Sequence, residues 1–242
     1  MLLGIAMMAL LEQLHSLGYV HGDLKPENFC VGTDRDAGVK GTNHLASKLF
    51  LIDFGVACRF LDATGRHLQE TDGEHETDHG QHKLTKGVPT TTVVAAQHSD
   101  TTQHHRTVGS LRYASIHAHR GQQARRSRRC DIESAAYVLV YLWLGKLPWQ
   151  GTKGSSRPDL SAKVAKAKLD TTTGDLCRQC PALQEVLEYC LKLSHTAKPD
   201  YAHLQGVFQK WLVFEVSHGW LLRWSFPHFG VNACNAVLYF WC

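Results

Sequence analysis

Apolar residues recur at helical spacing from the start of the chain. They lie three or four positions apart, at Leu3, Met7, Leu10, Leu14 and Leu17. This period is typical of a helix with one buried face, and the glycine that directly follows the last leucine suits a helix end. The pattern therefore predicts that the chain opens with an amphipathic helix.

Two short apolar runs come next. Residues 29–31 (FCV) and 49–52 (LFLI) flank a polar stretch that contains glycine, which predicts a pair of short strands. The polar octet HGDLKPEN, at 21–28, precedes the first strand, and the triplet DFG, at 53–55, follows the second. The pattern thus places a polar loop against each strand.

The second half of the chain predicts helices separated by polar segments. Residues 131–144 are apolar on nearly all sides, as is typical of a buried central helix. A polar connector is expected over 151–175, followed by helical stripes over 183–191 and 201–211. The expected fold class is mainly α, with one short β-hairpin.

Two segments show no such period. Residues 62–106 are rich in Thr, Gln, His, Asp and Gly, a composition that predicts a mobile insertion. Its His75, His79 and His82 have the spacing of zinc ligands, but no cysteine supports such a site. A histidine-biased loop of low complexity is the favoured interpretation. Residues 214–242 carry three tryptophans and no clear period.

The overall composition is that of a globular protein with a core. The 242 residues are 43% hydrophobic and 20% charged, and the net charge of +4 is too small to indicate nucleic-acid binding by itself. Scattered cysteines and the lack of a signal-peptide pattern favour an intracellular setting, in the cytoplasm, the nucleus or both. The longest apolar run, at 135–144, is about half of what a membrane span requires, so no membrane partner is expected.

The two polar loops carry groups suited to phosphoryl transfer, which needs a positioned hydroxyl and cations around the transferring group. Asp23 can accept the proton of the incoming hydroxyl, and Lys25 can reach the phosphate. Asn28 and Asp53 supply oxygen ligands for Mg²⁺. Gly55 lets the backbone turn away from the metal. The pair of loops predicts a site for metal-assisted phosphate transfer.

Five strings carry a resemblance to a known family: HGDLKPENF, LFLIDFG, TVGSLRYASIHAHRG, RRCDIESAAYVLVYLWLGKLPWQG and KPDY. Together they resemble the casein kinase I group of protein kinases, including its tau-tubulin-kinase and vaccinia-related-kinase relatives. The resemblance implies a protein-kinase C-lobe over residues 1–213. It also implies a serine/threonine kinase that uses ATP and Mg²⁺ and phosphorylates protein substrates near acidic or phosphorylated residues.

The resemblance assigns roles to the residues of the two loops. Asp23 is implied to be the catalytic base, and Lys25 to contact the phosphate of ATP. Ser110 matches a threonine that hydrogen-bonds the catalytic aspartate and lysine. Asn28 and Asp53 are implied to hold magnesium and, through it, the nucleotide.

Further residues are implied to support this site. Asp131 matches an aspartate of the central helix that braces the catalytic loop, and His21 and Gly55 are assigned to structural support. Arg128 and Arg129 match paired arginines that form an anion site beside the activation segment. Such a site would select acidic or already phosphorylated substrates.

The sequence departs from the family pattern at the segments 62–106 and 214–242 and in two further places. Protein kinases cover ATP with a small N-terminal lobe, and what precedes the octet is too short for one. The expectation is a C-lobe with the N-lobe missing, which binds ATP weakly or not at all. Gly22 stands where most kinases have an arginine that pairs with an activation-loop phosphate, so we expect activity not to depend on such a phosphate.

Alternatives to the kinase interpretation stay open. A catalytically inactive, kinase-like scaffold would bind partners through the arginine cluster at 120–129 and the aromatic tail at 214–242, although this tail could be a gene-model artefact. The cluster could also be a solvated loop or a nuclear-localisation or nucleic-acid patch. No aromatic stacking pattern accompanies it, so no nucleic acid is expected. Cys177 and Cys180 could be half a zinc site or a redox pair, but packing is favoured.

Overall fold

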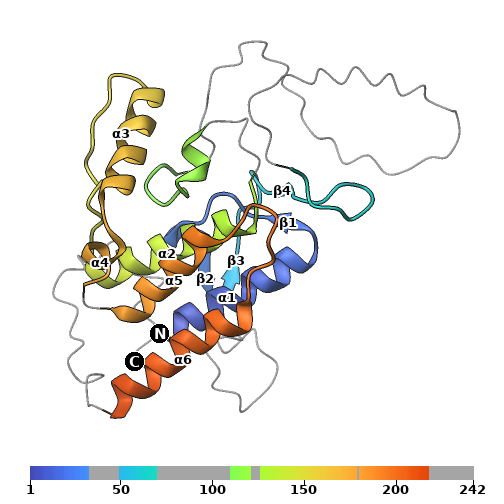
Figure 1. The fold of residues 1–242 in the computed structure, drawn as a ribbon, viewed down its shortest axis with the longest axis vertical. Helices are drawn as coiled ribbons and strands as arrows, with labels where there is room; N and C mark the ends of the chain where they lie inside the picture. Colours follow the sequence, from blue (N-terminus) through green and yellow to red (C-terminus); the bar gives the residue numbers. More distant parts are fainter. Residues whose placement is uncertain (33–48, 70–109, 121–125, 179, 218–242) are drawn as a thin grey trace, which may run out of the picture.

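The computed structural model describes residues 1–32, 49–69, 110–120, 126–178 and 180–217 (Figure 1). In this part the chain is mainly helical, with a few short strands. The histidine triplet considered for zinc lies outside the described residues, as do most of the predicted insertion and nearly all of the aromatic tail.

The described elements alternate early and become helical later. In chain order they are α1 (Leu2–Ser16), β1 (Tyr19–Val20), η1 (Pro26–Asn28), β2 (Phe29–Val31), β3 (Leu49–Leu51), β4 (Cys58–Arg59), η3 (His117–Arg120), α2 (Arg128–Leu144), α3 (Arg157–Asp170), α4 (Thr173–Leu176), α5 (Pro181–Lys192) and α6 (Tyr201–Ser217).

The first and last helices, α1 and α6, lie side by side and run in opposite directions (Figure 1). Near the start of α1, Gly4 lies against the ring of Phe208, and an added Cβ at Gly4 would come within 2.9 Å of the ring atoms. At the other end of α1, His15 contacts the hydroxyl of Tyr201. The lack of a side chain at Gly4 thus lets the two helices approach closely.

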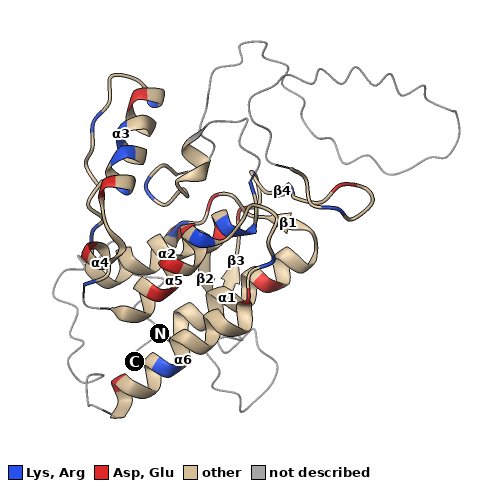
Figure 2. Cartoon of the chain, viewed as in Figure 1, with Lys and Arg blue, Asp and Glu red and all other residues tan. Residues whose placement is uncertain are grey.

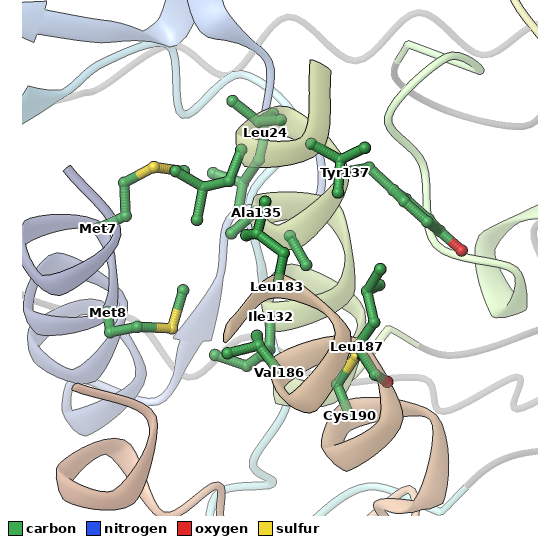
Figure 3. Packing of buried hydrophobic residues seen from close by; sticks show 14 of the residues in the cluster. Met7, Met8, Leu24, Ile132, Ala135, Tyr137, Leu183, Val186, Leu187 and Cys190 are labelled. Atoms are coloured by element: carbon green, nitrogen blue, oxygen red, sulfur yellow. The ribbon is translucent and has the colours of Figure 1, made fainter. Parts of the chain in front are cut away.

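The core surrounds α2, as the sequence predicts. Ile132 and Ala135 of this helix are completely buried and face Met7 of α1 and Val186 of α5 (Figure 3). The helix begins three residues before the predicted range and ends at Gly145, whose φ of 75° suits the left-handed C-cap. A helix with apolar residues on all sides is stable here because other helices cover it.

The strands place the two polar loops beside each other. The predicted hairpin is confirmed: β2 pairs with β3 in antiparallel register, with Phe29 opposite Leu51. A second pair, β1 with β4, sets Val20 opposite Cys58. One loop runs from β1 to β2 and the other from β3 to β4. Because the strands at both ends are paired, the loops between them are held together.

The predicted connector over 151–175 is wrong, since this segment contains α3 and α4. The N-cap of α3 is Ser156, whose hydroxyl accepts a hydrogen bond from the backbone of Asp159. The buried positions of α3 are Ser161, Val164 and Lys168. Two of the three are polar, so the fully buried positions of this helix do not form an apolar stripe in the sequence.

Two predicted boundaries fall inside ordered structure. The predicted insertion begins at Asp62, but the carboxylate of Asp62 accepts hydrogen bonds from the backbone of Thr64 and Arg66. The backbone N–H of Leu68 then donates a hydrogen bond to the carbonyl of Phe60. This Asx-type turn explains why a polar segment is folded here. The boundary at residue 213 lies within α6, which continues to Ser217.

Candidate active site

The structure brings the two predicted loops together at Lys25. Its Nζ lies 3.1 Å from Oδ2 of Asp23 and 3.7 Å from Oδ2 of Asp53. The hydrogen bond with Asp23 raises the pKa of Lys25, aided by the charges of both aspartates and opposed by slight burial. One ammonium group therefore lies between two carboxylates that are distant in sequence.

Asp23 is held by a backbone donor at its carboxylate and by a side-chain donor at its main-chain carbonyl. The backbone N–H of Ser110 donates to Oδ1 of Asp23 at 2.6 Å. The side-chain amide of Asn28 donates to the backbone carbonyl of Asp23 at 2.8 Å. The resemblance implied a side-chain role for Ser110, whereas the contact to Asp23 comes from its main chain. Asp23 is thus oriented by the segment that begins at Ser110.

Asn28 and Asp53 fit a hard divalent cation by their chemistry. Because the amide nitrogen of Asn28 faces a carbonyl, its oxygen lies on the opposite branch of the group, where it can act as a ligand. Asp53 has a φ of 64°, and the side chain is about half exposed. It is the one non-glycine residue with positive φ in the described part of the chain. Such strain is typical of functional turns.

Gly55 follows this strained turn closely. Its backbone N–H lies 3.4 Å from Oδ1 of Asp53, a long and weak hydrogen bond. An added Cβ at Gly55 would lie 3.3 Å from the same oxygen, so a side chain there would crowd the carboxylate. Gly55 therefore leaves space at one face of the proposed metal ligand.

Asp131 of α2 holds the loop before Asp23. Its two oxygens accept the backbone N–H groups of His21, at 2.6 Å, and of Gly22, at 2.9 Å. Oδ2 also lies 3.0 Å from Nε2 of His15. Burial alone would raise the pKa of Asp131, but the hydrogen bonds from His15 and the two backbone donors hold it below its ordinary value. The buried carboxylate thus stays charged.

His15 and Tyr201 belong to this network, although the sequence analysis did not single them out for it. Nε2 of His15 lies 3.0 Å from Asp131 and Nδ1 lies 2.5 Å from the hydroxyl of Tyr201; in the neutral ring with its proton on Nε2, Nδ1 accepts from that hydroxyl. The chain of bonds joins α1, α2 and α6 beneath the loop. No local pattern in the sequence predicts this network, because Asp131 and Tyr201 lie 116 and 186 positions from His15.

His21 joins the two loops directly. Its Nε2 donates to the carbonyl of Ile52 at 3.0 Å, and Nδ1 accepts the backbone N–H of Asp23 at 3.3 Å. These two bonds need the neutral ring with its proton on Nε2. The imidazole therefore links Ile52, the residue before Asp53, to Asp23.

The arginines at the N-terminal end of α2 form a basic group (Figure 2). Arg129 is 8% exposed and donates to the carbonyl of Leu193 at 3.1 Å. Arg128 donates to the carbonyl of Thr196 at 2.7 Å and stacks over the ring of Phe60. Both guanidinium groups thus bind internal acceptors. Arg129 is therefore little exposed to a substrate, and the anion site implied at Arg128 and Arg129 stays a prediction.

A buried polar cluster lies under the segment that follows Ser110. Nζ of Lys168 donates to the carbonyls of Leu111 and Ala114 and lies 3.1 Å from Nε2 of His119. Glu133 of α2 accepts the backbone N–H of Ile116 at 2.8 Å. Burial lowers the pKa of Lys168 to about 7, although Glu133 opposes this effect. The sequence analysis missed this cluster together with the helix that carries Lys168.

Cys177 and Cys180 pack in the core, as favoured from the sequence. They are 2% and 1% exposed, and burial raises their pKa values to about 12 and about 11. Both therefore remain thiols at neutral pH. Within the described residues, no cluster of three or more His, Cys, Asp or Glu could hold a metal ion.

Comparison with known proteins agrees with this geometry. No protein-family model matches the chain. Casein kinase 1-like protein HD16 of rice (Oryza sativa subsp. japonica) is 36% identical to it over 207 residues, which are 85% of this chain and 24% of HD16. This identity, over most of the chain, makes the chain a homologue of a protein kinase. More specifically, the chain is a casein kinase 1-like homologue, which confirms the resemblance read from the sequence.

The chain spans about a quarter of the length of this relative. Among the helices that the structure describes, none is long and apolar enough to cross a membrane.

Proposed function

We propose that residues 1–213 are the C-lobe of a serine/threonine protein kinase that transfers the γ-phosphate of ATP to a protein hydroxyl. The observation that carries this proposal is the position of Lys25 Nζ, 3.1 Å from Asp23 and 3.7 Å from Asp53. The homology to a casein kinase 1-like protein supports it. Phosphoryl transfer depends on charges positioned around the transferring group, and these three residues would supply such charges at one place.

Asp23 acts as the base in this proposal. A substrate hydroxyl gives its proton to the Asp23 carboxylate as its oxygen bonds to the γ-phosphorus, and the bond from phosphorus to the bridging oxygen breaks to release ADP. The hydrogen bond from Ser110 N–H holds one carboxylate oxygen at 2.6 Å. Lys25 offsets negative charge on the transferring phosphate.

Asn28 and Asp53 would hold Mg²⁺ through their oxygens. When bound, the metal neutralises the charge of the nucleotide phosphates. The carboxylate of Asp53 is accessible, with a side chain 54% exposed, and the orientation of Asn28 is fixed by its bond to the Asp23 carbonyl. Both features favour a ligand set that is already arranged before metal binds.

The finer substrate preference rests on the basic group at α2. We propose that substrates with acidic or phosphorylated residues near the target hydroxyl are preferred. The guanidinium of Arg128 is partly exposed and belongs to this basic group, whereas Arg129 serves the fold.

A kinase assay on the full-length gene product tests the proposal. Phosphate transfer to a serine peptide with acidic flanking residues is followed while the Mg²⁺ concentration varies. We expect transfer by the wild type, and a higher Mg²⁺ requirement and a rate at least about 100-fold lower in Asp53→Asn. Asp170→Asn, on the exposed face of α3, is the control and should match the wild type.

The scaffold alternative predicts a different outcome. A folded wild-type protein that transfers no phosphate at any Mg²⁺ concentration would reject the kinase proposal. Retained binding of partner proteins in that case would favour the scaffold.

A further inference from the structure

Arg126 lies where the two loops meet, just before α2. Its Nη1 donates to the carbonyl of Val56 at 2.8 Å, across 70 positions of sequence. Val56 follows the turn of Asp53 and precedes β4. The guanidinium therefore holds the far end of the turn that carries the proposed metal ligand.

Gly22 provides the space for this guanidinium. An added Cβ at Gly22 would lie 2.1 Å from Nη1 of Arg126 and 3.0 Å from its Cδ and Cζ. Nη1 thus occupies the volume that a side chain at position 22 would take. The φ of Gly22, 76°, also favours glycine. The glycine and the arginine are complementary in shape.

The turn of Asp53 is therefore held from both sides by residues of other segments. His21 donates to the carbonyl of Ile52, just before Asp53, and Arg126 donates to the carbonyl of Val56, three residues after it. A turn with a φ of 64° at Asp53 is strained and needs such support. Loss of one of the two links would leave the carbonyl at one end of the turn without its hydrogen-bond donor.

We propose that Arg126 is a positioning residue for phosphate transfer: packed on Gly22 and bonded to Val56, it keeps Asp53 beside Asp23. This inference rests on the proposed function. It assigns a second role to Gly22, which admits an arginine from the α2 side against the catalytic loop. The link is permanent in the folded chain, since it uses a backbone carbonyl and no added group.

A double-mutant cycle on the full-length gene product tests this role. Arg126→Met keeps an unbranched stem of similar bulk but removes the guanidinium with its donors, and Gly22→Ala displaces the guanidinium without changing it. Gly145→Ala is the matched control, because Gly145 has a φ of 75° and nothing within 4 Å of an added Cβ. It carries similar backbone strain and makes no new contact.

We expect Arg126→Met to lower kcat about tenfold or more, with little change in KM for the peptide, because the substrate site is intact while the metal ligand moves. Arg126→Lys, which keeps a charged donor, should restore part of kcat. Gly22→Ala should lower kcat similarly in the wild type. In the Arg126→Met background, Gly22→Ala should lower kcat only as much as Gly145→Ala does.

Hydrogen exchange of the backbone amides at residues 53–58 separates this inference from the kinase proposal. In both Arg126→Met and Gly22→Ala, these amides should exchange faster than in Gly145→Ala, whether or not the wild type transfers phosphate. Unchanged exchange together with unchanged kcat in Arg126→Met would overturn the inference. If that variant does not fold, Arg126→Lys and Gly22→Ala with wild-type kcat and exchange would overturn it equally.

Discussion

Replacement of Asp131 by asparagine tests the network beneath the catalytic loop. In the wild type, Oδ1 accepts the N–H of Gly22, and Oδ2 accepts both the N–H of His21 and Nε2–H of His15. An asparagine offers one oxygen and one NH₂ group in place of the two oxygens. In either orientation of the amide, an NH₂ group therefore faces a buried donor.

The expected loss of stability follows from these contacts. A buried donor without an acceptor costs about 1–3 kcal/mol, and the remaining hydrogen bonds lose the strength that the charged acceptor gave them. We therefore expect Asp131→Asn to lower the free energy of unfolding by about 2–4 kcal/mol. That is a large part of the about 5–15 kcal/mol typical of a folded domain.

Urea unfolding, followed by circular dichroism, measures this loss. Hydrogen exchange at the amides of His21 and Gly22 reports where it occurs, and both should exchange faster in Asp131→Asn. The control is Asp170→Asn, in which an exposed ion pair with Lys166 is lost; its stability should stay within about 0.5 kcal/mol of the wild type.

A small loss of stability in Asp131→Asn would refute this reasoning. If Asp131→Asn changed stability by no more than Asp170→Asn did, and the amides of His21 and Gly22 kept their slow exchange, Asp131 would not be the group that holds the loop.

Three further predictions concern buried groups. Tyr201→Phe leaves Nδ1 of His15 without its donor and should lower the free energy of unfolding by about 1–2 kcal/mol in urea; an unchanged urea midpoint would contradict the bond. Burial first, and the charge of Lys168 second, lower the pKa of His119 from 6.5 to about 3. Between about pH 6.5 and pH 3 the unfolded chain binds a proton that the folded chain does not. The free energy of unfolding should therefore fall as the pH is lowered through this window, by at most about 1.4 kcal/mol per pH unit, and this fall should be smaller in His119→Gln. Equal pH dependence in both proteins would oppose this. Cys177 and Cys180, buried as thiols, should resist iodoacetamide at pH 8 until urea unfolds the chain; fast native labelling would show that they are accessible.

The elements that the sequence predicted correctly are those whose own residues carry the pattern. The helix over 131–144 is apolar all round, and the strands at 29–31 and 49–51 are short apolar runs beside recognisable loops. In these cases local composition and final burial agree. The residues Asp23 and Asp53 could be singled out because their motifs are contiguous.

Other features depend on contacts that are invisible along the chain. The buried face of α3 carries Lys168, which is stable there because two backbone carbonyls accept its hydrogens. In the sequence, Arg126 is one basic residue of a cluster, and only the fold shows that it packs on Gly22. His15 is an ordinary residue near a helix end until Asp131 meets it. Each needed the tertiary structure, because the partner lies more than 50 positions away.

Transfer of labelled γ-phosphate from Mg-ATP to a serine peptide by the full-length gene product, in a single turnover, tests the central claim most directly. The account predicts transfer by the wild type and a rate about 100-fold or more lower in Asp23→Asn, with the thermal stability of the two proteins unchanged. Equal transfer by both proteins would contradict the role of Asp23 as the base, and no transfer by a folded wild type would contradict the kinase function itself.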